Sequence, residues 1–295
     1  MKILIIGGSG KIGKSFNFKN SKKTFYKNSI KNGIKFNLLK DNINIQLEKY
    51  KIDRVVILSA ISDPDYCLKN KRYSNILNVK KTIELIDILI KKNIYFIFFS
   101  SEYIFDGKKG SYSEKSKANP NNLYGKQKLI VENYINKKTK NFSIMRIGKT
   151  YGDNLKDNTL ISNFLTEIAN GRRIFKAAHD QIFNPLFVKD LEKIVRIFLK
   201  KKIKGTFNVG GPQKLSRIKI LKLITKLFEK KIQLKIKFKK VSLNDFPTID
   251  KRPLNVSMNI RKLKSKINFK MKTISNIAIK MIKKNNATIK TFKRR

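Results

Sequence analysis

Several residue types that carry common chemistries are scarce in this chain. Its 295 residues include one cysteine, one histidine and no tryptophan. A single cysteine excludes a disulfide bond within the chain, and one cysteine with one histidine makes a zinc site implausible. We therefore expect no bound metal.

Long apolar runs are missing as well. No stretch of 18 apolar residues occurs, so we expect no membrane-spanning helix and no membrane partner. The apolar run at the N-terminus reaches Gly7 after six residues. That length is too short for the core of a signal peptide and is typical of a first strand. A cytoplasmic enzyme fits these observations.

Acidic residues are few: 20 against 68 basic ones, which gives a formal charge of +48. Such an excess ordinarily indicates nucleic-acid binding. However, only 11 of the 68 basic residues are arginine, and the lysines spread along the whole chain. Lysine, asparagine and isoleucine are enriched together, as an AT-rich coding sequence would produce. We therefore expect no specific nucleic-acid partner, only weak, salt-sensitive adhesion.

The first 150 residues alternate short apolar runs with helical patterns. The unbroken run at residues 95–99 is typical of a strand in the buried centre of a parallel sheet. This alternation predicts an α/β fold with a doubly wound parallel sheet, the Rossmann arrangement. We expect strands at residues 2–6, 22–26, 34–38, 54–59, 94–100 and 142–147, and helices at residues 11–18, 43–50, 74–92 and 126–137.

The pattern loosens after residue 151. There we expect helices at residues 159–170, 189–202 and 216–229, with isolated strands at 207–209 and 232–238. This predicts a Rossmann domain over residues 1–150, to which segments from about 185–210 return. A smaller substrate-binding α/β lobe would cover residues 151–285, and residues 286–295 would form a basic tail.

A glycine-rich turn follows the first expected strand and opens a helix. Its glycines are Gly7, Gly10 and Gly13, with Lys11 and Ile12 between the last two. Glycine permits a tight bend, close approach of a pyrophosphate, and packing of the helix on the strand. The helix N-terminus adds free N–H donors. The turn predicts dinucleotide binding, with an ordinary strand–helix turn as the alternative.

The end of the second expected strand bears on the choice of dinucleotide. An acidic residue there would bind the ribose diol of NADH and repel the 2′-phosphate of NADPH. Residues 22–28 contain lysines and no carboxylate. The sequence therefore favours NADPH, with NADH as the alternative.

Tyr124 precedes the helix expected at residues 126–137 and Lys128 lies inside it, and residues four apart on a helix share one face. A neighbouring cation lowers the pKa of a phenol, which would let Tyr124 hand a proton to a developing alkoxide. In so lysine-rich a chain this spacing also arises by chance. Ser101 ends the strongest expected strand, at the sheet edge where ligands bind. A hydroxyl there can orient a carbonyl oxygen.

Taken together, these segments resemble a known family. Residues 7–13, the run Ser-Ser-Glu-Tyr-Ile-Phe-Asp-Gly at 100–107, and Tyr124 to Lys128 with Glu132 resemble extended short-chain dehydrogenases/reductases. Within that family the chain looks most like the dTDP-4-dehydrorhamnose reductase branch. Residues 180–190, 205–211 and 251–255 resemble further segments of that branch.

The resemblance implies roles for individual residues. Ser101, Tyr124 and Lys128 would form the catalytic set, in which Ser101 orients the keto oxygen, Tyr124 protonates it and Lys128 binds the nicotinamide ribose. Besides Tyr124 and Lys128, the cofactor would contact Gly7, Gly10, Lys11, Ile12, Gly13, Asn37, Leu38, Ala60, Ile61 and Ser62. The substrate would contact Ser101, Glu102, Lys149, Gln181 and Arg252.

Several positions depart from the pattern of that branch, among them Ser101 in place of a threonine and Lys81 in place of a glycine. Glu102 replaces an aspartate and keeps the carboxylate, while Asn37 stands where aspartate is frequent near the adenine. Lys149 occupies a place where the rhamnose enzymes tend to carry an aromatic residue near the sugar. The last change puts the identity of the hexose in doubt.

The resemblance implies NADPH-dependent reduction of the 4-keto group of a nucleotide-activated 6-deoxyhexose, in dTDP-rhamnose or related cell-surface polysaccharide synthesis. Two alternatives stay open. An epimerase or dehydratase of the same family would use the same residues but retain its NAD. A regulatory subunit would bind nucleotide without turning over. The residues also leave open whether the chain forms a homodimer.

Overall fold

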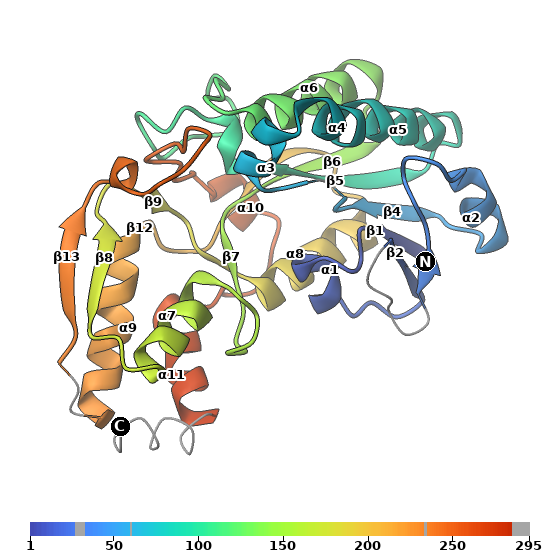
Figure 1. The fold of residues 1–295 in the computed structure, drawn as a ribbon. Helices are drawn as coiled ribbons and strands as arrows, with labels where there is room; N and C mark the ends of the chain where they lie inside the picture. Colours follow the sequence, from blue (N-terminus) through green and yellow to red (C-terminus); the bar gives the residue numbers. More distant parts are fainter. Residues whose placement is uncertain (27–32, 60, 233–234, 285–295) are drawn as a thin grey trace.

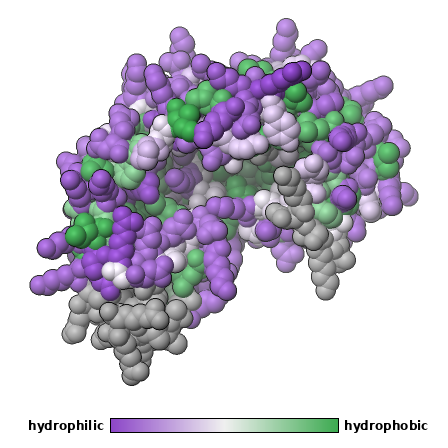
Figure 2. Space-filling model, viewed as in Figure 1, coloured by the Kyte–Doolittle hydropathy of each residue, from purple (hydrophilic) through white to green (hydrophobic). Residues whose placement is uncertain are grey.

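The computed structural model describes residues 1–26, 33–59, 61–232 and 235–284. The predicted tail at residues 286–295 lies outside the described residues. Two layers of helices enclose a central sheet, and a smaller lobe lies beside it (Figure 1). Hydrophilic residues cover most of the face seen in Figure 2, and hydrophobic ones show in patches.

The central sheet has seven strands in the order β11-β6-β5-β4-β1-β2-β3, and every neighbouring pair is parallel. This confirms the predicted doubly wound α/β fold. Its strands are β1 (Ile3–Ile6), β2 (Ser21–Phe25), β3 (Ile34–Lys35), β4 (Arg54–Ile57), β5 (Tyr95–Ser101), β6 (Phe142–Ile147) and β11 (Gly205–Val209).

Alternating side chains of the strands feed two separate hydrophobic cores. In β1, Ile3 and Ile5 pack into one core, whereas Leu4 and Ile6 pack into the other. The first core is covered by α1 (Lys11–Ser15), α8 (Val188–Lys201) and α10 (Arg261–Lys264). The second is covered by α2 (Ile43–Lys49), α5 (Lys81–Lys91) and α6 (Leu123–Lys138).

The helix expected at residues 74–92 is interrupted by a π-helical turn. The chain forms α3 (Pro64–Lys69), α4 (Lys71–Asn75), the π turn (Ile76–Lys80) and α5 in succession. Asn78 of the π turn is buried and donates to Gln127 of α6 at 2.8 Å. The extra residue of a π turn changes the direction in which its side chains point, and here it places the side-chain amide of Asn78 in the interior.

The smaller lobe is built on β8 (Ile174–Ala178), which pairs in parallel with β13 (Lys237–Val241). Three helices share a third hydrophobic core with this pair: α7 (Leu160–Ala169), α9 (Arg217–Ile232) and α11 (Ile274–Lys284). The strand expected at 232–238 is wrong at its start, because α9 extends through Ile232. Neither β8 nor α11 was predicted.

Short elements connect these units. They are the 3-10 turns at Glu102–Ile104 and Leu243–Asp245, and the two-residue strands β7 (Thr150–Tyr151), β9 (Ile182–Phe183), β10 (Leu186–Phe187) and β12 (Leu215–Ser216). In the described part of the chain, no helix is both long and apolar enough to cross a membrane. The division into domains near residue 150 stays a prediction.

Candidate active site

The glycine turn is held in a conformation that requires glycine. Gly7 has φ of +82°, and its N–H donates to Thr24 Oγ1 at 3.0 Å. A Cβ on Gly13 would lie 2.6 Å from Gly8 Cα, so α1 packs directly on the turn. Gly10 caps α1, and no side chain caps the helix there. The turn therefore leaves backbone N–H groups available beside a cavity.

Two cavities adjoin this turn and share Gly7, Gly10 and Leu58 in their linings. The first, of about 260 Å³, lies over the ends of β2 and β3. The second, of about 540 Å³, lies over the ends of β5 and β6. An elongated ligand could cross the turn and fill both, which is the fit that a dinucleotide needs.

Most residues predicted to bind the cofactor line these cavities. Asn37 and Leu38 line the first, and Lys11, Ile12 and Ser62 line the second. Gly13 also lines the second cavity. The N–H and carbonyl groups of Ile61 are instead held by the side chain of Asn78, and Ala60 lies outside the described residues.

The lysines of β2 do not support the preference for NADPH. Lys22 Nζ lies 5.2 Å from the centroid of the Tyr50 ring, and Lys23 Nζ donates to the Lys14 carbonyl at 3.5 Å. Neither residue lines the first cavity. The following segment, residues 27–32, lies outside the described residues.

Tyr124, Lys128 and Ser101 meet at the second cavity. Asn122 begins α6 by accepting from the Gly125 N–H at 2.8 Å, which places Tyr124 in the first turn. Lys128 Nζ donates to the Phe99 carbonyl at 2.8 Å and lies 5.9 Å from the Tyr124 ring centroid.

Burial raises the pKa of Tyr124 well above its ordinary value, although a side-chain hydrogen bond with Ser101 opposes the shift. We expected Lys128 to lower this pKa, and that expectation is wrong for the net shift, because the cost of burying a phenolate dominates. Burial also lowers the pKa of Lys128 to about 8, against the attraction of Glu132. Tyr124 is therefore a protonated phenol at neutral pH, the form that a proton donor needs.

Glu102 follows Ser101 and is buried at the wall of the same cavity. Its Oε2 has no hydrogen-bond partner among the described residues. Burial raises its pKa to about 8, and the ammonium and the N–H of Lys149 oppose that shift. Glu102 is therefore neutral at pH 7 and can donate a hydrogen bond as well as accept one.

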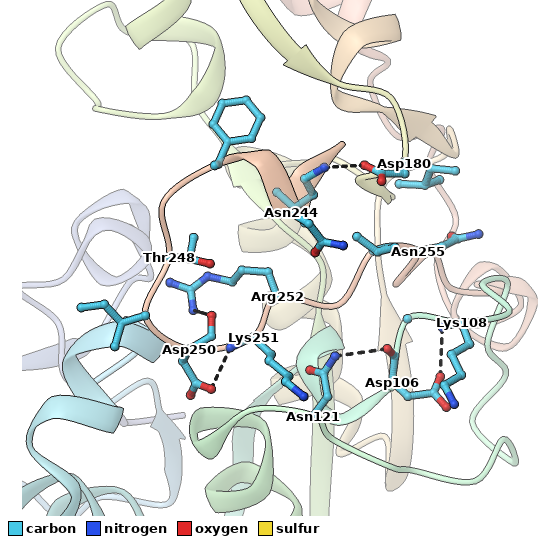
Figure 3. Close-up of a pocket in the computed structure, with 16 residues that line it drawn as sticks. Asp106, Lys108, Asn121, Asp180, Asn244, Thr248, Asp250, Lys251, Arg252 and Asn255 are labelled. Atoms are coloured by element: carbon cyan, nitrogen blue, oxygen red, sulfur yellow. Dashed lines mark hydrogen bonds between the residues drawn. The ribbon is translucent and has the colours of Figure 1, made fainter. Parts of the chain in front are cut away.

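The remaining predicted substrate residues lie apart from one another. Lys149 lines the second cavity, whereas Arg252 lines a third cavity of about 650 Å³. Figure 3 shows that third cavity, with Arg252 and Asp250 on one side and Asp106 on another. Gln181 is buried, its Oε1 has no partner among the described residues, and it lines none of these three cavities.

A fourth cavity, of about 470 Å³, lies in the smaller lobe among α7, β8 and the start of α9. Lys149 and Arg217 both line it, together with Arg172 and Lys176. The sequence offered no signal for Arg217, because one cation among 68 basic residues is inconspicuous. In the described residues no group of three histidine, cysteine or acidic side chains could hold a metal ion.

Comparison of this chain with models of known protein families identifies the family to which it belongs. The family model described as "RmlD substrate binding domain" matches residues 1–286. The chain is similar to the dTDP-4-dehydrorhamnose reductase of Aggregatibacter actinomycetemcomitans, with 23% identity over 76% of this chain and 78% of that protein. It is also similar to the methionine adenosyltransferase 2 subunit beta of Xenopus laevis, with 24% identity over 59% of this chain. It spans about half the length of that relative, 54%.

Solved structures share the fold. The dTDP-4-dehydrorhamnose reductase of Bacillus anthracis, in complex with NADP, superposes with a TM-score of 0.80, at 18% identity over 96% of this chain and all of that one. A Clostridium acetobutylicum dTDP-4-dehydrorhamnose reductase gives the same TM-score at 22% identity, over 97% of this chain and all of that one. At these identities the likeness establishes the arrangement of strands and helices alone.

Proposed function

The chain belongs to the RmlD substrate binding domain family, and from this premise we propose that it is an NADPH-dependent reductase of a nucleotide-activated 4-keto-6-deoxyhexose. The reaction would be that of a dTDP-4-dehydrorhamnose reductase. The observation that supports the proposal is that Ser101, Tyr124 and Lys128 line the same cavity as the glycine turn. A proton donor in that cavity would lie beside a dinucleotide bound at the turn.

The side chains supply the acid chemistry. The Ser101 hydroxyl binds and orients the keto oxygen, and the Tyr124 phenol, kept protonated by burial, gives that oxygen its proton. Lys128, anchored on the Phe99 carbonyl, sits beside Tyr124 and holds the ribose hydroxyls. Glu102 has a free oxygen at the same wall and binds a sugar hydroxyl.

The two adjoining cavities fit a dinucleotide. The glycine turn and Lys11 would hold the pyrophosphate, while Asn37 and Leu38 would hold the adenosine end. A nicotinamide dinucleotide supplies hydride chemistry at the carbonyl carbon when it is bound. NADPH is our first choice, with NADH as the alternative, because the Bacillus anthracis structure that shares this fold is a complex with NADP.

The test is oxidation of NADPH, with NADH alongside, across a panel of 4-keto nucleotide sugars. Turnover that depends on added cofactor supports the reductase. Turnover without added cofactor, or NAD that survives purification, would instead identify an epimerase or dehydratase with the same catalytic residues. No turnover with any member of the panel would contradict the proposal.

A second candidate is a nucleotide-binding subunit without turnover. It is favoured by the similarity to relatives named as the beta subunit of methionine adenosyltransferase 2 rather than as reductases. The complete set of Ser101, Tyr124 and Lys128 argues against it, because a site that only binds needs no proton donor. Dinucleotide binding seen by calorimetry, without turnover of any 4-keto sugar, would favour this candidate.

A further inference from the structure

Lys149 occupies the junction between two cavities. It lines the second cavity with Ser101 and Tyr124, and it lines the fourth cavity with Arg217. The residue follows the carboxyl end of β6, and its side chain reaches solvent in these cavities although protein groups surround it closely enough to lower its pKa. Carboxyl ends of parallel strands are where α/β proteins bind ligands. Lys149 can therefore touch a ligand that passes from the catalytic side into the smaller lobe.

Neither cation at this junction forms an ion pair among the described residues, although Glu167 also lines the fourth cavity and its charge opposes the lowering of the Arg217 pKa by burial. Lys149 Nζ lies 5.7 Å from the Phe183 ring centroid, and among the described residues no carboxylate comes within ion-pair distance of it. The Arg217 guanidinium lies 5.4 Å from the Phe246 ring centroid. Arg217 Nε is buried without a hydrogen-bond partner in the described part of the chain. Buried donors in native proteins are normally satisfied, so an unsatisfied one needs an explanation.

Lys149 and Arg217 line the same cavity, so their like charges act on each other. Loss of hydration lowers the pKa of Lys149 most, and the charge of Arg217, with those of Arg252 and Lys11, lowers it further. The charge of Glu102 opposes this shift, but burial raises the pKa of Glu102 to about 8 and so favours its neutral form. A cluster of like charges with unsatisfied hydrogen-bond donors is stabilised by an anion bound between them.

We propose that Lys149 and Arg217 form an oxyanion-binding pair that holds an anionic group of the substrate between the two cavities. The inference rests on the proposed function only in taking a nucleotide sugar as the ligand. The oxyanion has two sources, the diphosphate of that ligand or a carboxylate on its sugar ring. In both cases the charge of Lys149 decides which substrates are accepted.

The experiment measures binding of ready-made ligands by calorimetry, without turnover. The ligands are uridine and thymidine diphosphate, their glucose conjugates, and UDP-glucuronate. Lys149→Met and Arg217→Gln each remove one charge, and we expect each to weaken binding about tenfold to a hundredfold. Lys149→Arg keeps the charge and should retain most of the affinity.

The matched control is the double change Arg172→Met with Glu167→Gln. Both residues line the same cavity and already pair with each other, so removing the pair leaves the net charge unchanged and should change affinity less than about threefold. Circular dichroism establishes that each variant is folded. If Lys149→Met itself fails to fold, Arg217→Gln with its charge-keeping partner Arg217→Lys carries the test.

The ligand panel separates the two sources. If Lys149→Met and Arg217→Gln lose affinity equally for every diphosphate ligand, the pair binds the diphosphate. If they lose affinity only for UDP-glucuronate, the pair binds the sugar carboxylate. Unchanged affinities in Lys149→Met and Arg217→Gln would overturn the pair, as would failure of the unaltered protein to bind any of these ligands. Binding is measured without turnover, so the two proposals can fail separately. If the unaltered protein binds these ligands but turns over no 4-keto sugar, and Lys149→Met weakens the binding, the reductase is refuted and the oxyanion-binding pair is supported.

Discussion

Asp65 Oδ1 forms an ion pair with Arg252 Nη2 at 3.0 Å. The same oxygen accepts from the N–H groups of Ile249 and Asp250, at 3.1 and 2.8 Å. Asp65 belongs to α3, whose first residue, Pro64, lines the second cavity, whereas residues 249–252 belong to a loop that borders the third cavity (Figure 3). One carboxylate oxygen therefore fixes this loop, and Arg252 with it, against α3.

Replacing Asp65 with asparagine should loosen the loop without touching the proton donor. The amide oxygen still accepts hydrogen bonds but loses the charge that holds Arg252. Because the pair is partly exposed, we expect a rise in KM of about tenfold and little change in kcat. Steady-state kinetics measures both. A loss confined to kcat would show that Asp65 acts on the chemistry rather than on the loop.

Tyr124→Phe tests the proton donor. The substitution removes only the hydroxyl, so the buried ring keeps its packing and the glycine turn stays as it is. We expect turnover to fall at least a hundredfold, about the low end of what a general acid contributes. Dinucleotide affinity, measured by calorimetry, should remain nearly intact. Retention of more than a few per cent of the activity would remove Tyr124 from this role.

Glu102 should make stability depend on pH in an unusual direction. Its pKa is raised to about 8 from an ordinary 4.5. Between those values the folded protein holds a proton that the unfolded chain has lost, so the stability contributed by this group falls as pH rises from about 4.5 to 8. Glu102→Gln cannot ionise. Its free energy of unfolding relative to the original protein should therefore improve by about 2–4 kcal/mol between pH 5 and pH 8.5.

Urea denaturation at the two pH values gives that difference. The comparison is made between pH values within each protein, so any constant cost of burying the amide cancels. An equal change with pH in both proteins would mean that Glu102 titrates near its ordinary pKa.

Glu132 and Arg146 form the ion pair that is most deeply buried among the described residues, at 2.8 Å and with side chains 1% and 8% exposed. Glu132→Leu would leave Arg146 charged and unpaired inside the protein, which costs about 3–5 kcal/mol. The double variant with Arg146→Met should recover much of that loss. The control is Glu48→Gln, which breaks an exposed pair with Lys92 and should cost less than about 1 kcal/mol. Denaturant unfolding measures all three.

The sequence predicted what repeats along the chain and missed what only tertiary contacts decide. Apolar runs such as β5 indicate buried strands by themselves, so the positions of most strands and the α/β fold class followed from them. The rise in the pKa of Tyr124 could not be predicted, because the Lys128 spacing is visible in the sequence and the burial is not. Arg217 and Asp65 were missed for a similar reason. In the sequence neither residue differs from the many other charged residues. Only the folded structure shows that Asp65 pairs with Arg252 and that Arg217 forms no ion pair among the described residues.

Two glycine substitutions distinguish the role of the glycine turn in folding from its role in dinucleotide binding. Gly10 has φ of −71° and ψ of 167°, which alanine adopts easily, and an added Cβ would approach only the Gly7 carbonyl, at 3.4 Å. A Cβ on Gly13 would lie within 2.6 to 2.8 Å of backbone atoms of Gly8 and Gly7. Backbone atoms cannot rotate out of the way, so the second change forces α1 off the turn.

We expect Gly13→Ala to destabilise the protein by about 1–3 kcal/mol and to weaken dinucleotide binding with it. Gly10→Ala should cost no more than about 1 kcal/mol, the loss of a glycine cap. Because Gly10 lines both cavities beside the turn, its new methyl group would occupy space that the pyrophosphate needs. Its dissociation constant for NADPH should therefore rise about tenfold or more while the protein stays folded. Binding that equals that of the original protein in folded Gly10→Ala would mean that no dinucleotide crosses this turn.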